Sequence, residues 1–217
     1  REKQKIDPAF VLQDQENELR IKNFTPPSNI TGKAGSVLTI PVVVHVLHKG
    51  EAVGSGSNIS DAQIESAIDR LNEVYRGLDP NSPIDFEIEF SLAQRDPDCN
   101  PTTGINRVLA TGVAGYSSDG VFFGTAGGDE DELKDLSRWP ETDYCNIWIV
   151  SEIDGNNGGA GYQGYANFYN GNLREGSVMM ASVFGYNPGN TNGWGLNSNG
   201  DGGTVVHEFG HYFHLYH

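Results

Sequence analysis

Basic residues, sulfur-containing residues and long apolar runs are all scarce in this 217-residue chain. Lys and Arg number 14 against 29 Asp and Glu, which gives a formal net charge of −15. This balance argues against nucleic acid or an anionic membrane surface as a partner, because both attract Lys and Arg. The longest apolar run, residues 40–47, is too short to cross a bilayer, so we expect no membrane span.

There are only two cysteines, and they lie in different kinds of segment. Cys99 follows a turn-rich stretch, whereas Cys145 opens an apolar stretch at 145–150. In a secreted protein, two cysteines suggest one disulfide bond that closes the loop between them. Two unpaired thiols are the alternative. Their spacing does not match that of zinc-binding cysteines.

The strongest chemical signal is the pattern H-E-x-x-H formed by His207, Glu208 and His211. Two histidines four residues apart on a helix project from one face, close enough to bind one Zn²⁺ through ring nitrogens. The glutamate then lies beside a metal-bound water, where it acts as a general base. His217 falls six residues after His211, where the extended zinc-protease pattern has its third ligand.

The extended pattern has a glycine where this sequence has His214. On an unbroken helix, residue 214 would lie about 10 Å along the axis from His207, so three ligands converge only if the chain turns. Histidine tolerates the left-handed conformation of such a turn at a cost of about 1 kcal/mol. We therefore predict His214 at the corner and His217 as the third ligand. The alternative is that His214 is itself a ligand.

A second possible metal site precedes the helix. Residues 197–202 match several positions of an EF-hand calcium loop, and Glu208 would be its twelfth residue. However, Glu208 cannot clamp calcium from that loop and also serve a zinc-bound water. A turn that starts the helix is the better interpretation, so Zn²⁺ is the expected cofactor and Ca²⁺ the minor alternative.

Hydrophobic periodicity predicts an α+β domain over residues 39–217, after an N-terminal extension at 1–38. His45, in the first strand, is expected to be a hydrogen-bonded core residue. Ser60 and Gln63 form a capping box for a helix whose apolar positions reach Leu78. A second helix is expected after Asp129. The predicted strands are 39–47, 84–92, 105–109, 145–150, 164–168 and 177–184.

Several of these segments resemble the bacterial branch of the pappalysin family of metzincin zinc endopeptidases. The likeness lies at 40–46, 59–73, 86–90 with 96–98, and 146–148, and so extends beyond the zinc motif.

This resemblance implies a metzincin-like zincin catalytic domain with a twisted mixed sheet, a backing helix and an active-site helix above a horizontal cleft. A lower subdomain with a methionine-containing turn is expected to be absent, because Met179 and Met180 both precede the motif. The resemblance also implies a secreted or cell-surface protein and makes residues 1–38 a candidate pro-segment.

The sequence thus predicts a zinc-dependent endopeptidase in which His207, His211 and His217 bind Zn²⁺ and Glu208 is the general base. The resemblance places a protein or peptide substrate along an edge strand at Gly164, Tyr165 and Ala166, by strand addition.

Tyr162 and Tyr165 are further candidates for the cleft wall, with simple packing as the alternative. The competing function is a secreted, non-catalytic zinc-binding or interaction protein. Retention of Glu208 argues against it, since zinc binding alone needs no base. The sequence does not indicate the oligomeric state.

Overall fold

In the computed structural model, the chain divides into two units, Arg1–Ser36 and Val37–His217. The structure describes residues 36–157, 161–168, 174–189 and 191–216, nearly all of them in the second unit. The predicted extension at 1–38 lies outside the described residues except for its last three. Its role as a pro-segment therefore stays a prediction.

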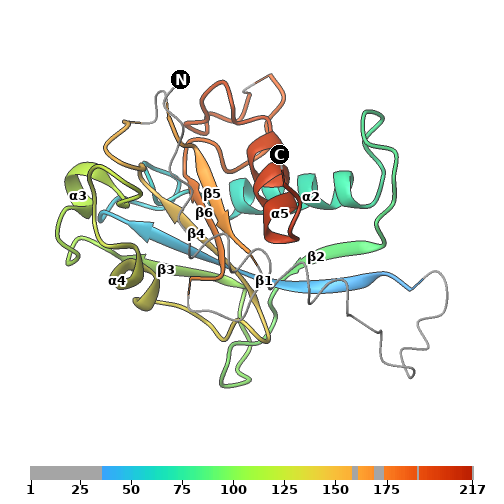
Figure 1. Ribbon diagram of the computed structural model, residues 1–217, viewed down its shortest axis with the longest axis horizontal. Coiled ribbons are helices and arrows are strands. Elements are labelled where there is room, and N and C mark those ends of the chain that lie inside the picture. The colour runs from blue at the N-terminus through green and yellow to red at the C-terminus, as the bar shows by residue number, and fades with distance from the viewer. Residues whose placement is uncertain (1–35, 158–160, 169–173, 190, 217) are drawn as a thin grey trace. The chain divides into compact units, whose positions relative to one another are not determined.

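A six-stranded mixed sheet forms the centre of the second unit, in the order β2-β1-β4-β6-β5, with β3 also paired to β1 (Figure 1). β2 pairs with the first half of β1 and β3 with the second half. All pairings are parallel except that of β5 with β6, so β5 is an antiparallel edge strand. The strands are β1 (Leu38–His48), β2 (Ile88–Leu92), β3 (Ile105–Leu109), β4 (Cys145–Val150), β5 (Gly164–Asn167) and β6 (Gly176–Met180).

The two faces of the sheet can be told apart by the strand register. His45, Trp148, Val178 and Tyr165 are neighbours across β1, β4, β6 and β5, so their side chains point to the same face. This face is covered by α4 (Glu130–Asp135), because the Nζ atom of Lys134 lies 4.7 Å from the centroid of the Trp148 ring. We call it the α4 face. The short helix α3 (Tyr116–Asp119) precedes α4 along the chain.

The opposite face is covered by α2 (Asp61–Tyr75) and α5 (Gly203–Tyr212), and we call it the α5 face. Phe90 of β2 pairs with Ile40 of β1. Ile40 lies an odd number of residues from His45, so Phe90 and Ile40 point to the face opposite that of His45. The ring centroid of Phe90 lies 5.3 Å from that of Tyr75 and 5.0 Å from that of Phe209. Figure 1 shows α5 beside β5 and β6, with α2 behind it.

The observed strands and helices confirm most of the predicted elements. Because both faces of the sheet are covered, β4 is buried along its whole length, as expected for a central parallel strand. The predicted capping box is confirmed only in its Ser60 half, where the Ser60 hydroxyl accepts a hydrogen bond of 3.2 Å from the backbone N–H of Gln63. The side-chain amide of Gln63 donates instead to the carbonyls of Ala181 and Phe184. Asp129 likewise caps α4.

Three predicted boundaries are wrong. α2 ends at Tyr75, and Leu78 lies beyond it with 71% of its surface exposed. β2 begins at Ile88, because Glu87 has a φ of +57° and the preceding Asp85 is paired with Arg76. β6 ends at Met180, whose carbonyl accepts from two later N–H groups and starts a turn.

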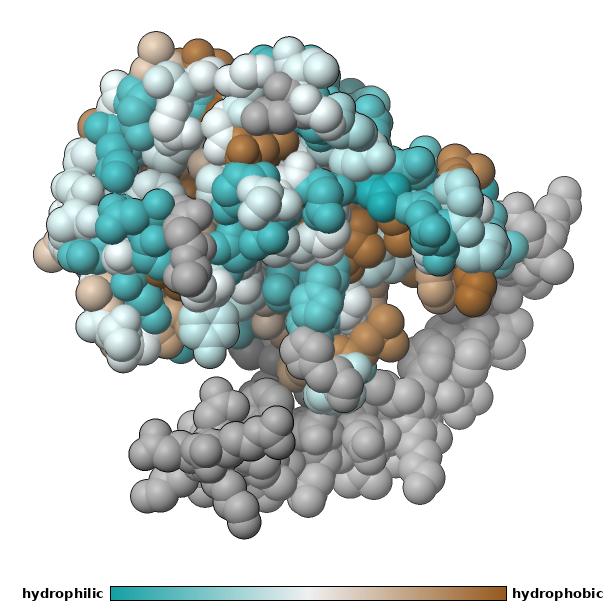
Figure 2. Space-filling view, turned by 90° about the horizontal axis from the view of Figure 1, so that it is seen from above, coloured by the Kyte–Doolittle hydropathy of each residue, from teal (hydrophilic) through white to brown (hydrophobic). Residues whose placement is uncertain are grey.

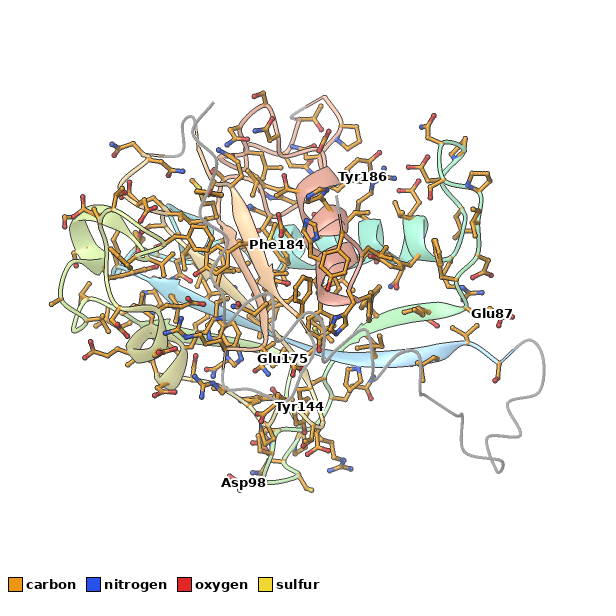
Figure 3. All side chains as sticks on the ribbon, in the orientation of Figure 1. Glu87, Asp98, Tyr144, Glu175, Phe184 and Tyr186 are labelled. Carbon is orange, nitrogen blue, oxygen red and sulfur yellow. The ribbon has the colours of Figure 1, made fainter. Side chains whose placement is uncertain are left out.

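The predicted disulfide bond between Cys99 and Cys145 is also wrong, since both thiols are free. Cys99 is exposed in the loop between β2 and β3, and Figure 3 shows the preceding residue, Asp98, at the far tip of that loop. Cys145 instead opens β4 inside the sheet and is buried. Burial raises the pKa of the Cys145 thiol to about 12 and so keeps it protonated.

The surface agrees with the polar composition of the chain. Hydrophilic residues predominate on the face shown in Figure 2, and hydrophobic residues form separate patches. Over the described part of the chain, no helix combines the length and the apolar character needed to cross a bilayer.

Candidate metal centre

The turn before α5 starts the helix abruptly. The side-chain oxygens of Asn197 and Asp201 each accept a hydrogen bond of 2.8 Å from the backbone N–H two residues later. Gly202 caps the helix with a φ of +74°, a conformation that side chains with a Cβ rarely adopt. These bonds agree with the predicted helix-starting turn.

The two histidines of the motif face each other on successive turns of α5. The Nε2 atoms of His207 and His211 are 3.1 Å apart, and their rings are nearly perpendicular. Two imidazole nitrogens bound to one tetrahedral Zn²⁺ lie about 3.3 Å apart, given Zn–N distances near 2.05 Å. The donor pair therefore fits a single zinc ion.

A backbone carbonyl fixes the orientation of His211. Its Nδ1 atom lies 2.7 Å from the carbonyl oxygen of Leu215. A carbonyl can only accept, so Nδ1 carries the hydrogen in the neutral ring and Nε2 keeps its lone pair. Such a second hydrogen bond is the usual way in which proteins orient a metal-binding histidine.

The predicted corner at His214 is confirmed. His214 has a φ of +64° and follows Phe213, the residue that caps the C-terminal end of α5. Its N–H donates to the carbonyl of His211 and the N–H of Leu215 to that of Gly210, the two bonds of a Schellman motif. The His214 ring stacks on Phe168, with centroids 5.0 Å apart. A histidine thus occupies the position of the usual glycine without loss of the turn.

The third predicted ligand, His217, lies outside the described residues. Within the described ranges, no group of three or more His, Cys, Asp and Glu side chains is arranged to hold a metal ion. The assignment of His217, and the alternative of His214, therefore remain predictions. The corner at His214 turns the chain away from the helix axis, as delivery of His217 requires.

Glu208 lies between α5 and the edge strand, with only 8% of its surface exposed. Burial raises the pKa of its carboxyl, and two weaker influences oppose this rise: the charge of His211 and a hydrogen bond with the backbone of Ala166. The carboxylate accepts this bond from the N–H of Ala166, because a main-chain carbonyl has no hydrogen to donate. Glu208 is therefore fixed beside the strand predicted to bind substrate.

The hydrogen bonding of β5 leaves one edge of the strand open. The carbonyl of Gln163 accepts from the N–H of Met180, so by antiparallel alternation Gly164 and Ala166 direct their backbone groups away from β6. A Cβ atom on Gly164 would come within 2.7 Å of the Met179 sulfur and 3.1 Å of the Val178 carbonyl oxygen, so a larger residue there would require the Met179 side chain to shift. The N–H of Ala166 on this edge is engaged by Glu208, whereas the backbone groups of Gly164 and the carbonyl of Ala166 can pair with an added strand.

A cleft of about 660 Å³ brings the predicted residues together. Its wall includes His207, Glu208 and His211 from α5 and the β5 residues Gly164, Tyr165 and Ala166. Tyr162 also lines the cleft and is 51% exposed, whereas Tyr165 is 7% exposed and belongs mainly to the core.

Two supporting contacts were not predicted from the sequence. The hydroxyl of Tyr212 donates to Oε1 of buried Glu175, 3.1 Å away, at the last turn of α5. Figure 3 shows Glu175 just beyond the lower end of α5. The Asn197 amide donates to the Gln163 side chain across the cleft wall. Both contacts join residues far apart in sequence, so periodicity and spacing carry no signal for them.

Solved structures similar to this chain support its resemblance to metalloproteases. No family model matches the chain, and neither does any curated protein. A mutant of Tannerella forsythia promirolysin matches with 30% identity and a TM-score of 0.68, over 98% of this chain and 66% of that chain. Mirolysin bound to a compound matches with 32% identity, a TM-score of 0.63 and coverages of 84% and 65%. Mature T. forsythia mirolysin with a cleaved peptide matches with 32% identity, a TM-score of 0.60 and the same coverages.

These neighbours identify the fold. Mirolysin is a bacterial metzincin-type, pappalysin-like metalloprotease, and the present α+β domain with its twisted sheet matches such a catalytic domain. The chain spans just under two thirds of the solved chains that it matches.

Proposed function

We propose that this protein is a zinc-dependent endopeptidase. The observation that carries the proposal is the convergence of the two Nε2 atoms of His207 and His211, 3.1 Å apart, beside the buried carboxylate of Glu208. Zinc would be bound by His207 and His211, with His217 as the third ligand. When bound, it supplies a Lewis acid that polarises the scissile carbonyl and lowers the pKa of water.

The chain's own residues supply positioning and proton transfer. Glu208 accepts the proton of the attacking water and passes it to the leaving amine. Burial raises the pKa of its carboxyl and so makes it a better proton acceptor than an exposed glutamate. The hydrogen bond with Ala166 fixes Glu208 relative to the edge strand, so a peptide paired with β5 would be placed close to the base.

The substrate is proposed to bind as an added strand along Gly164, Tyr165 and Ala166. The free edge of β5 and the cleft of about 660 Å³ beside it support this assignment. Mature mirolysin, a structural neighbour, has been solved with a cleaved peptide, which is consistent with a peptide substrate here.

A non-catalytic zinc-binding protein is the competing function. Glu208 argues against it, because a protein that only binds zinc has no need of a buried carboxylate beside the histidines. Burial of a carboxylate also costs free energy, and a protein that only binds zinc would gain nothing to offset this cost.

Residues 1–38 are proposed as a pro-segment, and a secreted or cell-surface location follows from the same resemblance. The share of this chain that each structural match covers supports the pro-segment. The match to promirolysin covers 98% of this chain, whereas the matches to mature mirolysin and to the compound complex cover 84%.

The proposal is tested by incubating the purified full-length protein with unfolded protein substrates and identifying products by mass spectrometry. We expect internal cleavage that stops when a chelator removes zinc and resumes when Zn²⁺ is restored. Samples truncated at Ser36 and untruncated samples are compared, because a pro-segment would suppress cleavage until removed. Zinc-loaded, correctly folded samples that cleave nothing in either form would favour the binding function.

A further inference from the structure

Three aromatic side chains form a cluster at the rim of the cleft. The Phe123 ring stacks on Tyr165 of β5, with centroids 4.3 Å apart and planes 29° apart. It also meets Tyr162, with centroids 4.7 Å apart at 66°. Phe123 is 39% exposed and Tyr162 51% exposed. The cluster therefore presents apolar ring surface to solvent beside the open edge of β5.

A single carboxylate holds Phe123 in this place. Oδ1 of Asp154 accepts hydrogen bonds from four consecutive backbone N–H groups, those of Phe123 and the next three residues, at 2.8–3.3 Å. Burial would raise the pKa of Asp154, but the four donors outweigh burial and lower it. The loop is thus fixed by charge-assisted hydrogen bonds, and its exposed aromatic ring is held in a defined position.

The strand register shows which part of a bound peptide would meet the cluster. Side chains of an added strand alternate between the two faces of the sheet. Tyr165 points to the α4 face, so a substrate residue opposite Tyr165 also directs its side chain to that face. There it would lie next to Phe123, which already covers Tyr165, and next to Tyr162 in the cleft wall.

The peptide is assigned an antiparallel pairing with β5, because antiparallel strand pairs are slightly more stable per residue than parallel ones. This pairing fixes the direction of the peptide. Glu208 marks the scissile bond and is bonded to Ala166. An antiparallel peptide passes Ala166 first and Tyr165 and Tyr162 afterwards. The residue that meets the aromatic cluster is then on the C-terminal side of the scissile bond.

We propose that Phe123 and Tyr162 form a subsite that selects a bulky apolar side chain of the peptide, on the C-terminal side of the scissile bond. The inference rests on the proposed function, because it places the occupant on the strand edge where that function places the substrate. It adds a specificity-determining pair outside the zinc motif. Asp154 acts as a positioning residue, since it holds Phe123 without reaching the peptide.

The test uses the full-length zinc-loaded protein and a set of fluorogenic peptides. The peptides differ only in having Ala, Leu or Phe at each of the first three positions after the cleaved bond. We expect one position at which wild type prefers Leu or Phe over Ala. Phe123→Ala should lower kcat/KM for the Leu and Phe peptides about 10-fold, mainly through KM, and change the Ala peptide about twofold or less.

Matched variants separate specificity from folding. Phe122 neighbours Phe123 on the same loop and is 46% exposed, but it does not belong to the ring stack of Phe123, Tyr162 and Tyr165. Phe122→Ala should leave the preference unchanged. Phe123→Leu should keep most of the preference, because it retains apolar volume. An equal loss for all peptides with Phe123→Ala, or a preference that is unchanged, would overturn the subsite.

A binding measurement separates this inference from the proposed function. Glu208→Ala protein, loaded with zinc, is titrated with the same peptides and their affinities are compared with and without Phe123→Ala. A preference for Leu or Phe that depends on Phe123 supports the subsite even if wild type hydrolyses nothing. Equal affinities for all peptides would reject the subsite even if hydrolysis is observed.

Discussion

Two histidines with similar hydrogen bonds have different surroundings in this molecule. Nε2 of His45, in the central strand β1, is 2.8 Å from Oδ1 of Asn146. Nδ1 of His211, on α5, is 2.7 Å from the carbonyl of Leu215. In each ring, one nitrogen donates its hydrogen to an oxygen. In the neutral ring, the other nitrogen therefore carries no hydrogen and can only accept. The rings differ in what this second nitrogen faces.

The second nitrogen of His45 faces the core, and that of His211 faces another histidine. Nδ1 of His45 is buried without a hydrogen-bond partner among the described residues, and the ring stacks on Trp148 at 5.2 Å. Burial lowers the pKa of His45 to about 4, against the opposing effect of Asn146. Nε2 of His211 instead meets Nε2 of His207 at the cleft. Convergence of two ring nitrogens at an accessible point, and not the residue type, distinguishes the proposed ligand His211 from the core histidine His45.

The largest effect is expected from removing a cleft histidine. His211→Ala leaves His207 and His217, and two ligands seldom hold catalytic zinc tightly. We expect the full-length variant to lose zinc and to hydrolyse peptides only at the background rate. Metal analysis and a fluorogenic-peptide assay measure both. His45→Gln, the matched change in the core, should retain about one zinc per chain, and a zinc-loaded His211→Ala protein would contradict the assignment.

Removing the base should separate catalysis from zinc binding. Glu208→Ala leaves the three histidines in place, so zinc content should stay near one per chain. Loss of a general base typically lowers the rate about 10²–10⁴-fold, and the same assay measures that loss. Undiminished hydrolysis would contradict the mechanism. Loss of zinc together with activity would instead assign Glu208 a structural part in the site.

The core histidine should make stability depend on pH. The unfolded chain protonates His45 near pH 6.5, whereas the folded chain does so near pH 4. The unfolded state therefore binds more protons between these values, so stability is complete above pH 6.5 and falls as the pH falls toward 4. A difference of about 2.5 pKa units corresponds to about 3 kcal/mol.

Denaturant unfolding from pH 7 to pH 4 tests this dependence. His45→Gln does not titrate in this range, so its free energy of unfolding should fall about 3 kcal/mol less than that of wild type. His48→Gln is the control, because His48 is only partly buried at the end of β1. Parallel curves for wild type and His45→Gln would show that His45 does not carry the effect.

Local signals in the sequence were sufficient for the parts of the structure that depend on local chemistry. Ser60 caps α2 and His214 forms the corner, because capping and backbone conformation are properties of a few adjacent residues. The zinc motif works in the same way, since His207 and His211 are one helical turn apart. The core role predicted for His45 is confirmed by its burial and its hydrogen bond.

Contacts between distant segments could not be predicted in this way. Asp154 accepts from the loop at 123–126, and Tyr212 donates to Glu175, with no periodic pattern to connect them. The cysteine prediction was wrong for a related reason. The sequence indicated a turn-rich stretch at Cys99 and a strand at Cys145, but not that the first thiol is exposed, the second buried and the two unpaired.

The smallest effect is expected at His214, a third kind of histidine whose importance lies in its backbone. A left-handed conformation costs a residue with a Cβ about 1 kcal/mol. His214→Gly removes this cost but makes the unfolded chain more flexible and loses the stack on Phe168. These terms oppose each other, so the free energy of unfolding should change by no more than about 1 kcal/mol. Zinc content should stay near one per chain.

The informative partner of this variant is His214→Val, because a β-branched residue strongly resists a positive φ. Valine should destabilise the corner and, by misplacing His217, weaken zinc binding, whereas glycine should preserve it. If the imidazole of His214 were itself the third ligand, glycine and valine would both remove it, and both variants would lose zinc to the same extent. Zinc content and melting temperature, measured side by side for the two full-length variants, therefore distinguish a histidine that turns the chain from one that binds the metal.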